Sequence, residues 1–188
     1  MGKLIYAAIT SLDGYIEDKD GGFGWAMPDD EVHSCINNLQ EDIGTFLLGR
    51  RMYQTLQVWE EFYGKTDLIK VMRDYATLWH GTDKVVFSKT LEEVSTSRTR
   101  IERVFDPETI RRMKADADHD LSVGGAELGG QALRAGLVDE IHLFISPVLV
   151  GGGKPALPEI KETRLELLGQ QRFGNGVVHL HYAVKTTV

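Results

Sequence analysis

Hydrophobic positions along the chain fall into short runs of strand length, separated by segments with helical spacing. Mostly apolar runs predict four buried strands, at residues 3–10, 45–49, 84–88 and 121–125. Spacing and turn residues predict helices at 28–43, 50–62, 66–80, 106–117 and 126–136. After residue 138 the pattern changes, since three strand-like segments follow with no helix between them, at 139–150, 164–173 and 176–184.

Alternation of strands and helices, followed by a closing run of strands, is typical of an α/β protein. It predicts a single domain over residues 1–188 with three layers, α/β/α. The sheet should be mixed but mainly parallel, with antiparallel C-terminal strands. Residues 151–159 are expected to form a loop.

Capping residues set several of the predicted helix boundaries. Asp106 is placed to cap a helix that has Pro107 at its first position, and Gly136 is placed to end the helix before it. Pro28 suits the first turn of the first helix, which would carry one apolar stripe: Val32, Ile36, Leu39 and Ile43.

Composition narrows the class of protein without naming a function. Apolar residues make up 42% and charged residues 26% of the 188, as in an ordinary globular protein. The net charge of −7 argues against nucleic acid or an anionic membrane as the main partner. Cys35 is the only cysteine, so no intramolecular disulfide can form. We see no secretion signal or membrane-spanning run and expect a cytoplasmic protein.

Residues suited to anion binding follow three of the predicted parallel strands. They are Gly49-Arg50-Arg51, Ser88-Lys89 and Gly124-Gly125. Because parallel strands end at the same edge of a sheet, these segments should meet and bind a ligand with more than one phosphate. Each has an ordinary alternative as a solvated helix start, a surface lysine or a turn. Gly129 and Gly130 fit close packing better than ligand contact.

Five quoted segments carry a resemblance to a known family. They are "LIYAAITSLDGYI", "LLGRRMY", "VVFSKTL", "LSVGGAELGGQAL" and "GLVDEIHLFISPVLVGGGKPAL". Through them the chain resembles the dihydrofolate reductase-like fold family, above all the reductase domain of bifunctional riboflavin-biosynthesis deaminase/reductases. The resemblance implies an NADPH site formed by Ala7 and Ala8 at the nicotinamide, Gly49, Arg50 and Arg51 at the phosphates, Ser88 and Lys89 at the 2′-phosphate, and Gly124, Gly125, Ala126, Glu127 and Leu128 at the pyrophosphate.

Two carboxylates are candidates for catalysis. Aligned with dihydrofolate reductases through "GWAMPDDEV", Asp30 falls on their catalytic acid, but it could instead complement the helix dipole. Asp13 of "SLDG" could contact substrate or simply form a turn. Asp30, Ser34 and Asn37 share one helix face, and if that face lines the cleft, the cleft is polar and unlike that of a folate reductase.

These observations favour an NADPH-dependent reductase that passes hydride to a C=N or carbonyl-derived group of a small heterocycle, as 5-amino-6-(5-phosphoribosylamino)uracil reductase does. The alternatives are dihydrofolate reductase proper and a non-catalytic nucleotide-binding protein. The resemblance also implies a homodimer formed through residues 139–153. The segment around Trp59 could close over a ligand or pack in the core. His179 and His181 share one side of a strand, but without a third ligand in view we assign no metal site.

Overall fold

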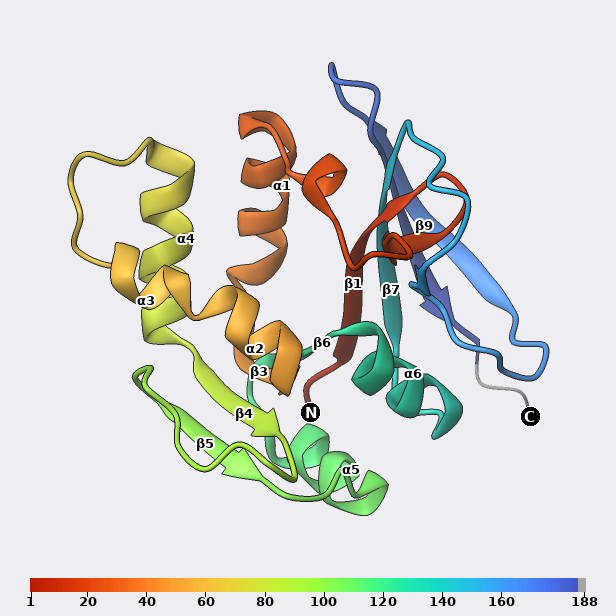
Figure 1. Cartoon of the computed structure of the whole chain (residues 1–188). Coiled ribbons are helices and arrows are strands. Elements are labelled where there is room, and N and C mark those ends of the chain that lie inside the picture. The colour runs from red at the N-terminus through yellow and green to blue at the C-terminus, as the bar shows by residue number, and fades with distance from the viewer. Residues whose placement is uncertain (186–188) are drawn as a thin grey trace.

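Eight strands form one sheet in the order β5-β4-β3-β6-β1-β7-β10-β9 in the computed structural model, which describes residues 1–185 (Figure 1). Their bounds are β1 Leu4–Ser11, β3 Ile43–Gly49, β4 Asp83–Phe87, β5 Thr99–Glu102, β6 Asp120–Gly124, β7 Glu140–Ser146, β9 Leu165–Arg172 and β10 Val178–Val184. From β5 to β7 every pairing is parallel, and β10 is antiparallel to both β7 and β9. The predicted mixed sheet with antiparallel C-terminal strands is confirmed.

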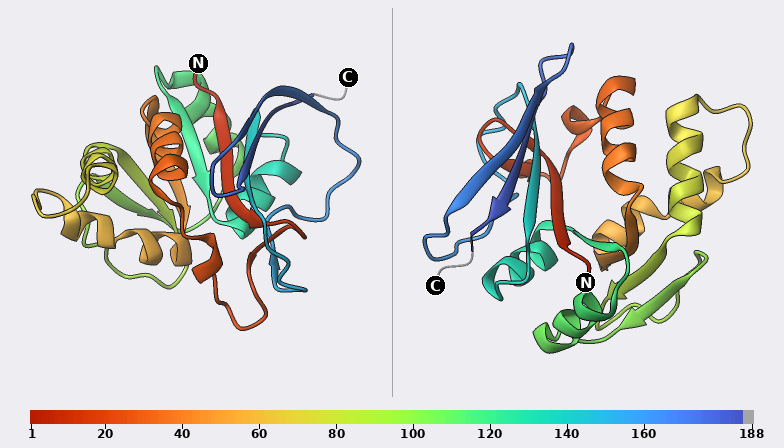
Figure 2. Two further views of the ribbon diagram at one scale, coloured as in Figure 1. Left: turned by 90° about the horizontal axis from the view of Figure 1, so that it is seen from above. Right: turned by 180° about the vertical axis from the view of Figure 1, so that it is seen from behind.

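Helices cover both faces of the sheet (Figures 1 and 2). One face packs against α1 Asp30–Gln40, α2 Arg50–Leu56, α3 Val58–Phe62 and α4 Lys70–Gly81, and the other against α5 Pro107–Asp116 and α6 Ala126–Arg134. The β9–β10 hairpin lies at the side of the molecule away from α4 in both figures. Within residues 1–185 no helix is long and apolar enough to cross a membrane.

Alternation along β1 explains why the core has two sides. Leu4 and Tyr6 pack with Leu133 of α6, whereas Ile5 packs on the opposite face with Trp79 of α4. Because core residues pack on both faces of the sheet at β1, this central strand is buried on both faces, as its continuous apolar run predicts.

The predicted caps of the last two helices are confirmed. Asp106 accepts the backbone N–H groups of Glu108 and Thr109 at 3.4 and 3.0 Å, and Pro107 opens α5. Gly136 follows α6 with φ of 64°, a left-handed conformation that favours glycine.

Several boundaries differ from the prediction, including the helix expected at 66–80, which is α4 and begins at Lys70. The helix expected at 28–43 is α1, which begins at Asp30 because Asp29 is the N-cap, so Pro28 lies outside it. Ile43 belongs to β3 rather than to the apolar stripe of α1. The helix expected at 50–62 is divided at Gln57 into α2 and α3.

Two strand pairings were not predicted. β5 is a four-residue edge strand in which exposed Arg100 and Glu102 alternate with half-buried residues, so it lacks an apolar run. A second, two-stranded sheet joins β2 Tyr15–Glu17 to β8 Lys154–Pro155, inside the segment expected to be a loop. It brings the connection after β1 against residues 151–155.

Candidate active site

A cleft of about 960 Å³ opens at the carboxyl ends of the parallel strands. Residues at or near the ends of β1, β3, β4 and β6 line it, among them Ala8, Gly49, Phe87 and Gly124. Parallel α/β sheets bind ligands at this edge, and the volume lies at the upper end of the roughly 300–1,000 Å³ of small-molecule pockets.

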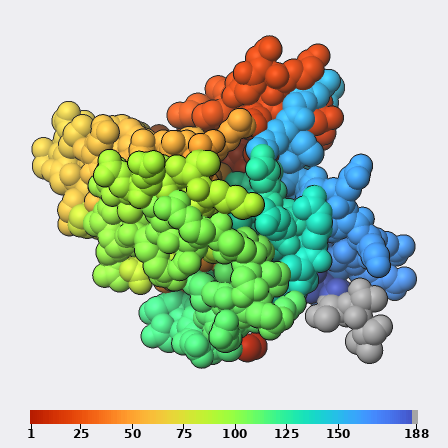
Figure 3. All heavy atoms as spheres, turned by 60° about the horizontal axis from the view of Figure 1, so that its bottom comes forward, coloured from red at the N-terminus to blue at the C-terminus, as the bar shows by residue number. Residues whose placement is uncertain are grey.

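All twelve residues expected to contact the cofactor line this one cleft. They come from four segments that are far apart in the sequence: Ala7, Ala8, Gly49, Arg50, Arg51, Ser88, Lys89, Gly124, Gly125, Ala126, Glu127 and Leu128. In Figure 3 orange atoms near residue 50 and light green atoms near residue 90 lie side by side on the surface. The fold therefore brings the four predicted cofactor-binding segments to one cleft, as expected from the strand ends. Their contacts with a ligand remain a prediction.

The start of α6 has the geometry of an anion site. Its N-cap, Gly125, has φ of 95°, and within the described chain no side chain caps the helix. The first N–H groups of a helix have no intrahelical partner and form the positive end of its dipole, and here no side chain of residues 1–185 satisfies them. A Cβ on Gly124 would stand 2.9 Å from Leu48, so a larger residue could not be added without a shift. Both glycines keep the backbone bare at the cleft wall.

Basic side chains line the same cleft near the segment that follows β4. Arg50 donates from Nη1 to Thr90 Oγ1 at 3.1 Å, which links the α2 start to the segment after β4. Arg103 donates to the carbonyl oxygens of Ser88 and Leu91 at 3.0 and 2.5 Å and also lines the cleft. Sequence reasoning missed Arg103, because the strand that carries the chain to it, β5, was not predicted.

The Ser88 hydroxyl has both a structural and a potential binding role. It is 8% exposed, and its oxygen accepts the N–H groups of Thr90 and Leu91 at 3.3 and 2.9 Å. Since an accepting hydroxyl keeps its own O–H to donate, Ser88 remains free to donate to an anion beside Lys89.

Two carboxylates accompany these cations. Glu127 accepts a hydrogen bond from Lys154 Nζ at 2.7 Å, and Glu17 lies 3.9 Å from both Lys154 and Arg51. The hydrogen bond from Lys154, followed by its charge, lowers the pKa of Glu127. Lys154 thus offsets two negative charges that would otherwise repel a phosphate group.

The substrate side of the cleft is less polar than expected. The face of α1 that lines it consists of His33, Ile36, Leu39 and Gln40. Asp30, Ser34 and Asn37 do not line the cleft, so the condition for a polar cleft is not met. Asn37 is buried and donates from Nδ2 to Val71 O at 2.9 Å, which joins α1 to the start of α4. The argument against a folate-like substrate, which rested on a polar helix face, therefore loses its basis.

His33 is a titratable residue on the substrate side of the cleft that sequence reasoning missed. Its half-buried ring lies 5.6 Å from the ring of Trp59 and 5.8 Å from that of Tyr75, and all three line the cleft. Burial lowers the pKa of His33, and the charge of Asp30, one helical turn away, opposes that shift. The spacing Asp30-x-x-His33 was the available signal, since residues three apart share a helix edge.

The two carboxylates expected to be catalytic lie outside the residues that line the cleft. Asp30 is the exposed first residue of α1. Asp13 accepts the backbone N–H groups of Val150 and Gly151 at 3.2 and 2.8 Å. A side-chain hydrogen bond with Ser11, with these N–H groups contributing less, lowers the pKa of Asp13. Its visible role is to hold the loop after β7, a contact that neither the substrate alternative nor the turn alternative predicted.

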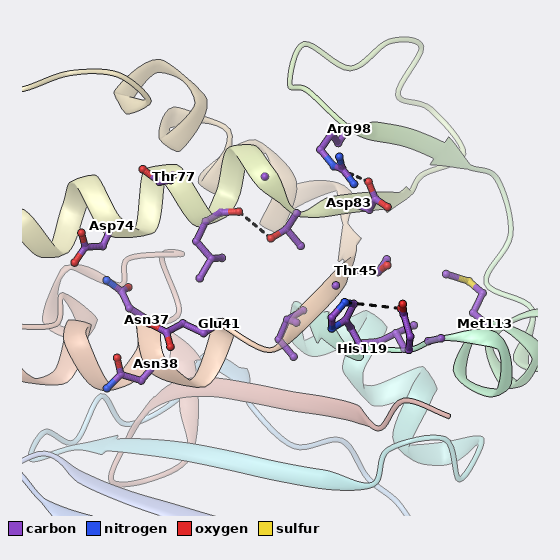
Figure 4. A pocket seen from close by; sticks show the side chains of 18 of the residues that line it. Asn37, Asn38, Glu41, Thr45, Asp74, Thr77, Asp83, Arg98, Met113 and His119 are labelled. Carbon is purple, nitrogen blue, oxygen red and sulfur yellow. Dashed lines mark hydrogen bonds and ion pairs between the residues drawn. The ribbon is translucent and has the colours of Figure 1, made fainter.

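A second hollow, of about 1330 Å³, lies at the opposite, amino ends of the strands (Figure 4). Ser34 and Asn37 face it together with Glu41 at the end of α1, Asp83 at the start of β4, and His119 before β6. Figure 4 shows the ion pair between Arg98 and Asp83, 2.8 Å long, on its wall. The polar face of α1 therefore looks away from the predicted site.

Solved structures show which fold class this is. A pyrimidine reductase-like protein of Corynebacterium diphtheriae matches with a TM-score of 0.71 at 18% identity, covering 99% of this chain and 93% of that one. A dihydrofolate reductase of Enterococcus faecalis, complexed with NADP(H), matches with a TM-score of 0.63 at 12% identity, covering 98% of each chain. The fold is the three-layer, dihydrofolate reductase-like α/β/α fold.

The chain itself belongs to the RibD C-terminal domain family, whose model matches residues 2–179. Uncharacterized protein YyaP of Bacillus subtilis is 29% identical over 183 residues, covering 96% of this chain and 94% of that protein. Family and fold together support a reductase of this type.

Proposed function

We propose that the protein is an NADPH-dependent reductase that passes hydride to a C=N or carbonyl-derived group of a small heterocyclic substrate. One observation carries the proposal: a single cleft at the carboxyl ends of the strands unites two bare glycines at a helix start with cations from four other segments. This combination suits a dinucleotide with several phosphates.

The residues present fit the extra phosphate that distinguishes NADPH from NADH. Lys89 follows Ser88 in the cleft wall, Arg103 donates to the Ser88 carbonyl oxygen, and Arg50 is tied to the same segment through Thr90. A 2′-phosphate needs a cationic partner, which these side chains can supply. Arg51 and the start of α6 would then bind the pyrophosphate.

When bound, NADPH supplies the hydride, and the side chains of this cleft bind and orient the reactants. Ala7 and Ala8 leave room beside the end of β1, where a flat ring can lie against the strand. Ile36, Leu39 and Trp59 wall the other half and exclude water, which strengthens electrostatic interactions there.

We assign proton transfer to His33 rather than to a carboxylate in direct contact with substrate. Reduction of an imine or carbonyl needs a proton as well as a hydride, and an imidazole facing the cleft can hold one. In this scheme Asp30 acts through His33 by favouring its protonated form, and Asp13 acts only through the loop at residues 150–151.

Dihydrofolate reduction is the second candidate, favoured by the apolar Ile36 and Leu39 on the cleft face of α1. A pterin and its aryl group need such a surface. Parallel assays with dihydrofolate and with ribosylaminopyrimidines separate the two substrates. NADPH binding without turnover of either class would instead point to a nucleotide-binding protein.

The cofactor assignment is tested by titrating NADPH and NADH separately, following nicotinamide fluorescence at low salt. We expect NADPH to bind at least tenfold more tightly, and Lys89→Ala to remove most of that preference while changing NADH binding little. Lys161→Ala, which removes an exposed lysine outside the cleft, is the matched control. Equal affinity for both nucleotides in the parent protein would contradict the proposal.

The expected homodimer also stays a proposal, and the sheet order suggests a different strand for its interface. β7 lies between β1 and β10, so the strand within residues 139–153 is not an edge strand of the sheet. The edge on that side is β9, where Leu165, Leu167 and Leu168 are 41%, 51% and 48% exposed. Light scattering of the purified protein, compared with a Leu167→Lys variant, tests whether this strand mediates association.

A further inference from the structure

A cluster of histidines outside the cleft joins β7 to β10. His142 faces His181 across the antiparallel pair, and their rings stack with centroids 3.9 Å apart. Glu140, two residues before His142, lies on the same side of β7. His181 Nε2 is 2.8 Å from Glu140 Oε2, and His142 Nε2 is 3.8 Å from the same oxygen. The ligand atoms of all three residues lie within 4.8 Å of one another.

Among the described atoms of this cluster, one buried ring nitrogen lacks the hydrogen-bond partner that a buried polar atom needs. His142 is 4% exposed, yet its Nε2 is buried without a hydrogen-bond partner. Its Nδ1 lies 2.9 Å from His179 Nε2. If Nδ1 carries the hydrogen and donates it to His179, then Nε2 presents a lone pair toward a carboxylate oxygen. Two acceptors facing each other in a buried place need a cation or a proton between them.

We propose that Glu140, His142 and His181 form a site for a divalent cation of the zinc class. Two imidazoles and a carboxylate are a ligand set that zinc takes in proteins. A tetrahedral ion with bonds of about 2.0–2.1 Å holds its ligand atoms about 3.4 Å apart. The observed 2.8 and 3.8 Å bracket that value, so small side-chain movements suffice.

The surrounding residues fit the second layer of such a site. In the proposed site His142 Nδ1 would donate to His179 Nε2, 2.9 Å away, which fixes the tautomer that leaves His142 Nε2 for the ion. Lys3 donates to Glu140 Oε1 at 2.6 Å, which leaves Oε2 as the single coordinating oxygen. The side chain of His181 is 26% exposed, which gives the ion an entry path and leaves a fourth position for water.

The ion would cross-link the parallel part of the sheet to its antiparallel hairpin. β7 is the last parallel strand and β10 pairs with it from Val178 to Ala183. His179 also stacks on Phe144, with ring centroids 4.3 Å apart, and Phe144 lines the cleft. Bound metal would therefore stiffen the side of the sheet that supports the cleft without entering it.

The test uses untagged, chelator-treated protein and zinc chloride alone, measured by isothermal titration calorimetry. We expect one zinc per chain with a dissociation constant in the micromolar range or tighter, and a rise of a few degrees in the unfolding midpoint. His181→Gln and His142→Gln should each weaken binding at least tenfold, and His179→Phe roughly tenfold. His119→Gln, which alters an exposed histidine elsewhere, should leave binding unchanged.

Cobalt(II) provides a measurement that needs no variant. The intense visible bands of a tetrahedral cobalt complex are expected in the parent protein and should disappear on adding zinc. Magnesium should not compete, because it prefers oxygen ligands in octahedral geometry. Absence of stoichiometric zinc binding, or equal affinity in folded His181→Gln protein, would overturn the assignment. Should the buried His142 variant not fold, His181→Gln and the cobalt spectrum still decide.

Discussion

The two ends of the parallel sheet carry hollows that differ in charge. At the carboxyl ends, the cleft is lined by five basic residues (Arg50, Arg51, Lys89, Arg103 and Lys154) and two acidic ones (Glu17 and Glu127). At the amino ends, the hollow is lined by five acidic residues (Glu41, Asp74, Asp83, Asp116 and Asp118) and three basic ones (Lys70, Arg98 and Arg112). Only the first matches an anionic ligand.

Helix direction reinforces that difference. α2 and α6 begin at the cleft, whereas α1, α4 and α5 end at the hollow. Helix starts favour anions and helix ends favour cations, by roughly 0.3–1 kcal/mol each at exposed sites. The larger hollow is therefore the poorer place for a nucleotide, which shows that volume alone does not identify a site.

The largest effect is expected from Gly125→Val. A β-branched residue at φ of 95° is strained and would displace the first turn of α6. We expect NADPH binding to weaken several hundred-fold, on the order of 3–4 kcal/mol. Fluorescence titration measures this, with Gly169→Val in β9 as a control whose added atoms meet open space. Equal affinity in both variants would argue that the start of α6 binds no phosphate.

At the amino end, Lys84 allows a pH test of stability. It is fully buried, donates to the carbonyl oxygens of Trp79 and Thr82 at 2.5 and 2.7 Å, and burial lowers its pKa to about 8. Between that value and its unfolded pKa of 10.5 the unfolded chain binds more protons, so stability from this residue rises with pH. We expect at most about 3 kcal/mol over this range.

Urea unfolding of the parent protein and of Lys84→Met at pH 7 to 10.5 measures that contribution. The unfolding free energy of the parent protein should rise with pH relative to that of Lys84→Met, because the methionine cannot titrate. Parallel pH profiles would show that Lys84 keeps an ordinary pKa.

A smaller effect, roughly 100-fold on turnover, is expected from His33→Gln. If protonated His33 donates to substrate, turnover falls as the pH rises through its pKa, which burial holds below 6.5. Asp30→Asn removes the charge that opposes this shift, so the decline should move to lower pH. Steady-state rates against pH measure both. A decline that persists unchanged in His33→Gln would assign it to another group.

The smallest effect concerns the charges at the cleft rim. Lys154→Met leaves Glu127 and Glu17 without their shared partner, so NADPH binding should weaken about 3–10-fold, or about 1 kcal/mol. The loss should shrink as salt screens the charges, which titrations at two ionic strengths would show. Tighter binding in the variant would mean that the carboxylates do not approach a phosphate.

Local sequence signals predicted well which strand-end segments meet in the cleft, and predicted poorly which face of α1 lines it. Gly49, Ser88 and Gly124 each follow a recognisable buried strand, and parallel strands must end at one edge, so their convergence could be inferred. The cleft face of α1 could not be inferred in this way. A helical pattern shows which residues share a face, but the packing of α4, through Asn37 and Val71, decides where that face points.

The fold was likewise predictable where a local sequence signal specifies an element, and not where contacts between elements decide it. Long apolar runs and caps such as Asp106 specify their elements locally. β5 escaped prediction because its stability comes from backbone pairing with β4 rather than from an apolar pattern of its own. Arg103 was missed with it, and the His142–Glu140 pair was missed because only strand register brings it against His181.

The contact between Tyr6 and Gly129 has a consequence for how relatives of this chain can diverge. A Cβ on Gly129 would lie 2.5 Å from the Tyr6 ring, and the Tyr6 hydroxyl donates to Ala156 O at 2.6 Å. A relative with a larger residue at position 129 must therefore have a smaller one at position 6. It would then lose the tyrosine hydroxyl that anchors the 151–159 loop, so positions 6 and 129 should vary together, whereas position 156 contributes only its backbone carbonyl.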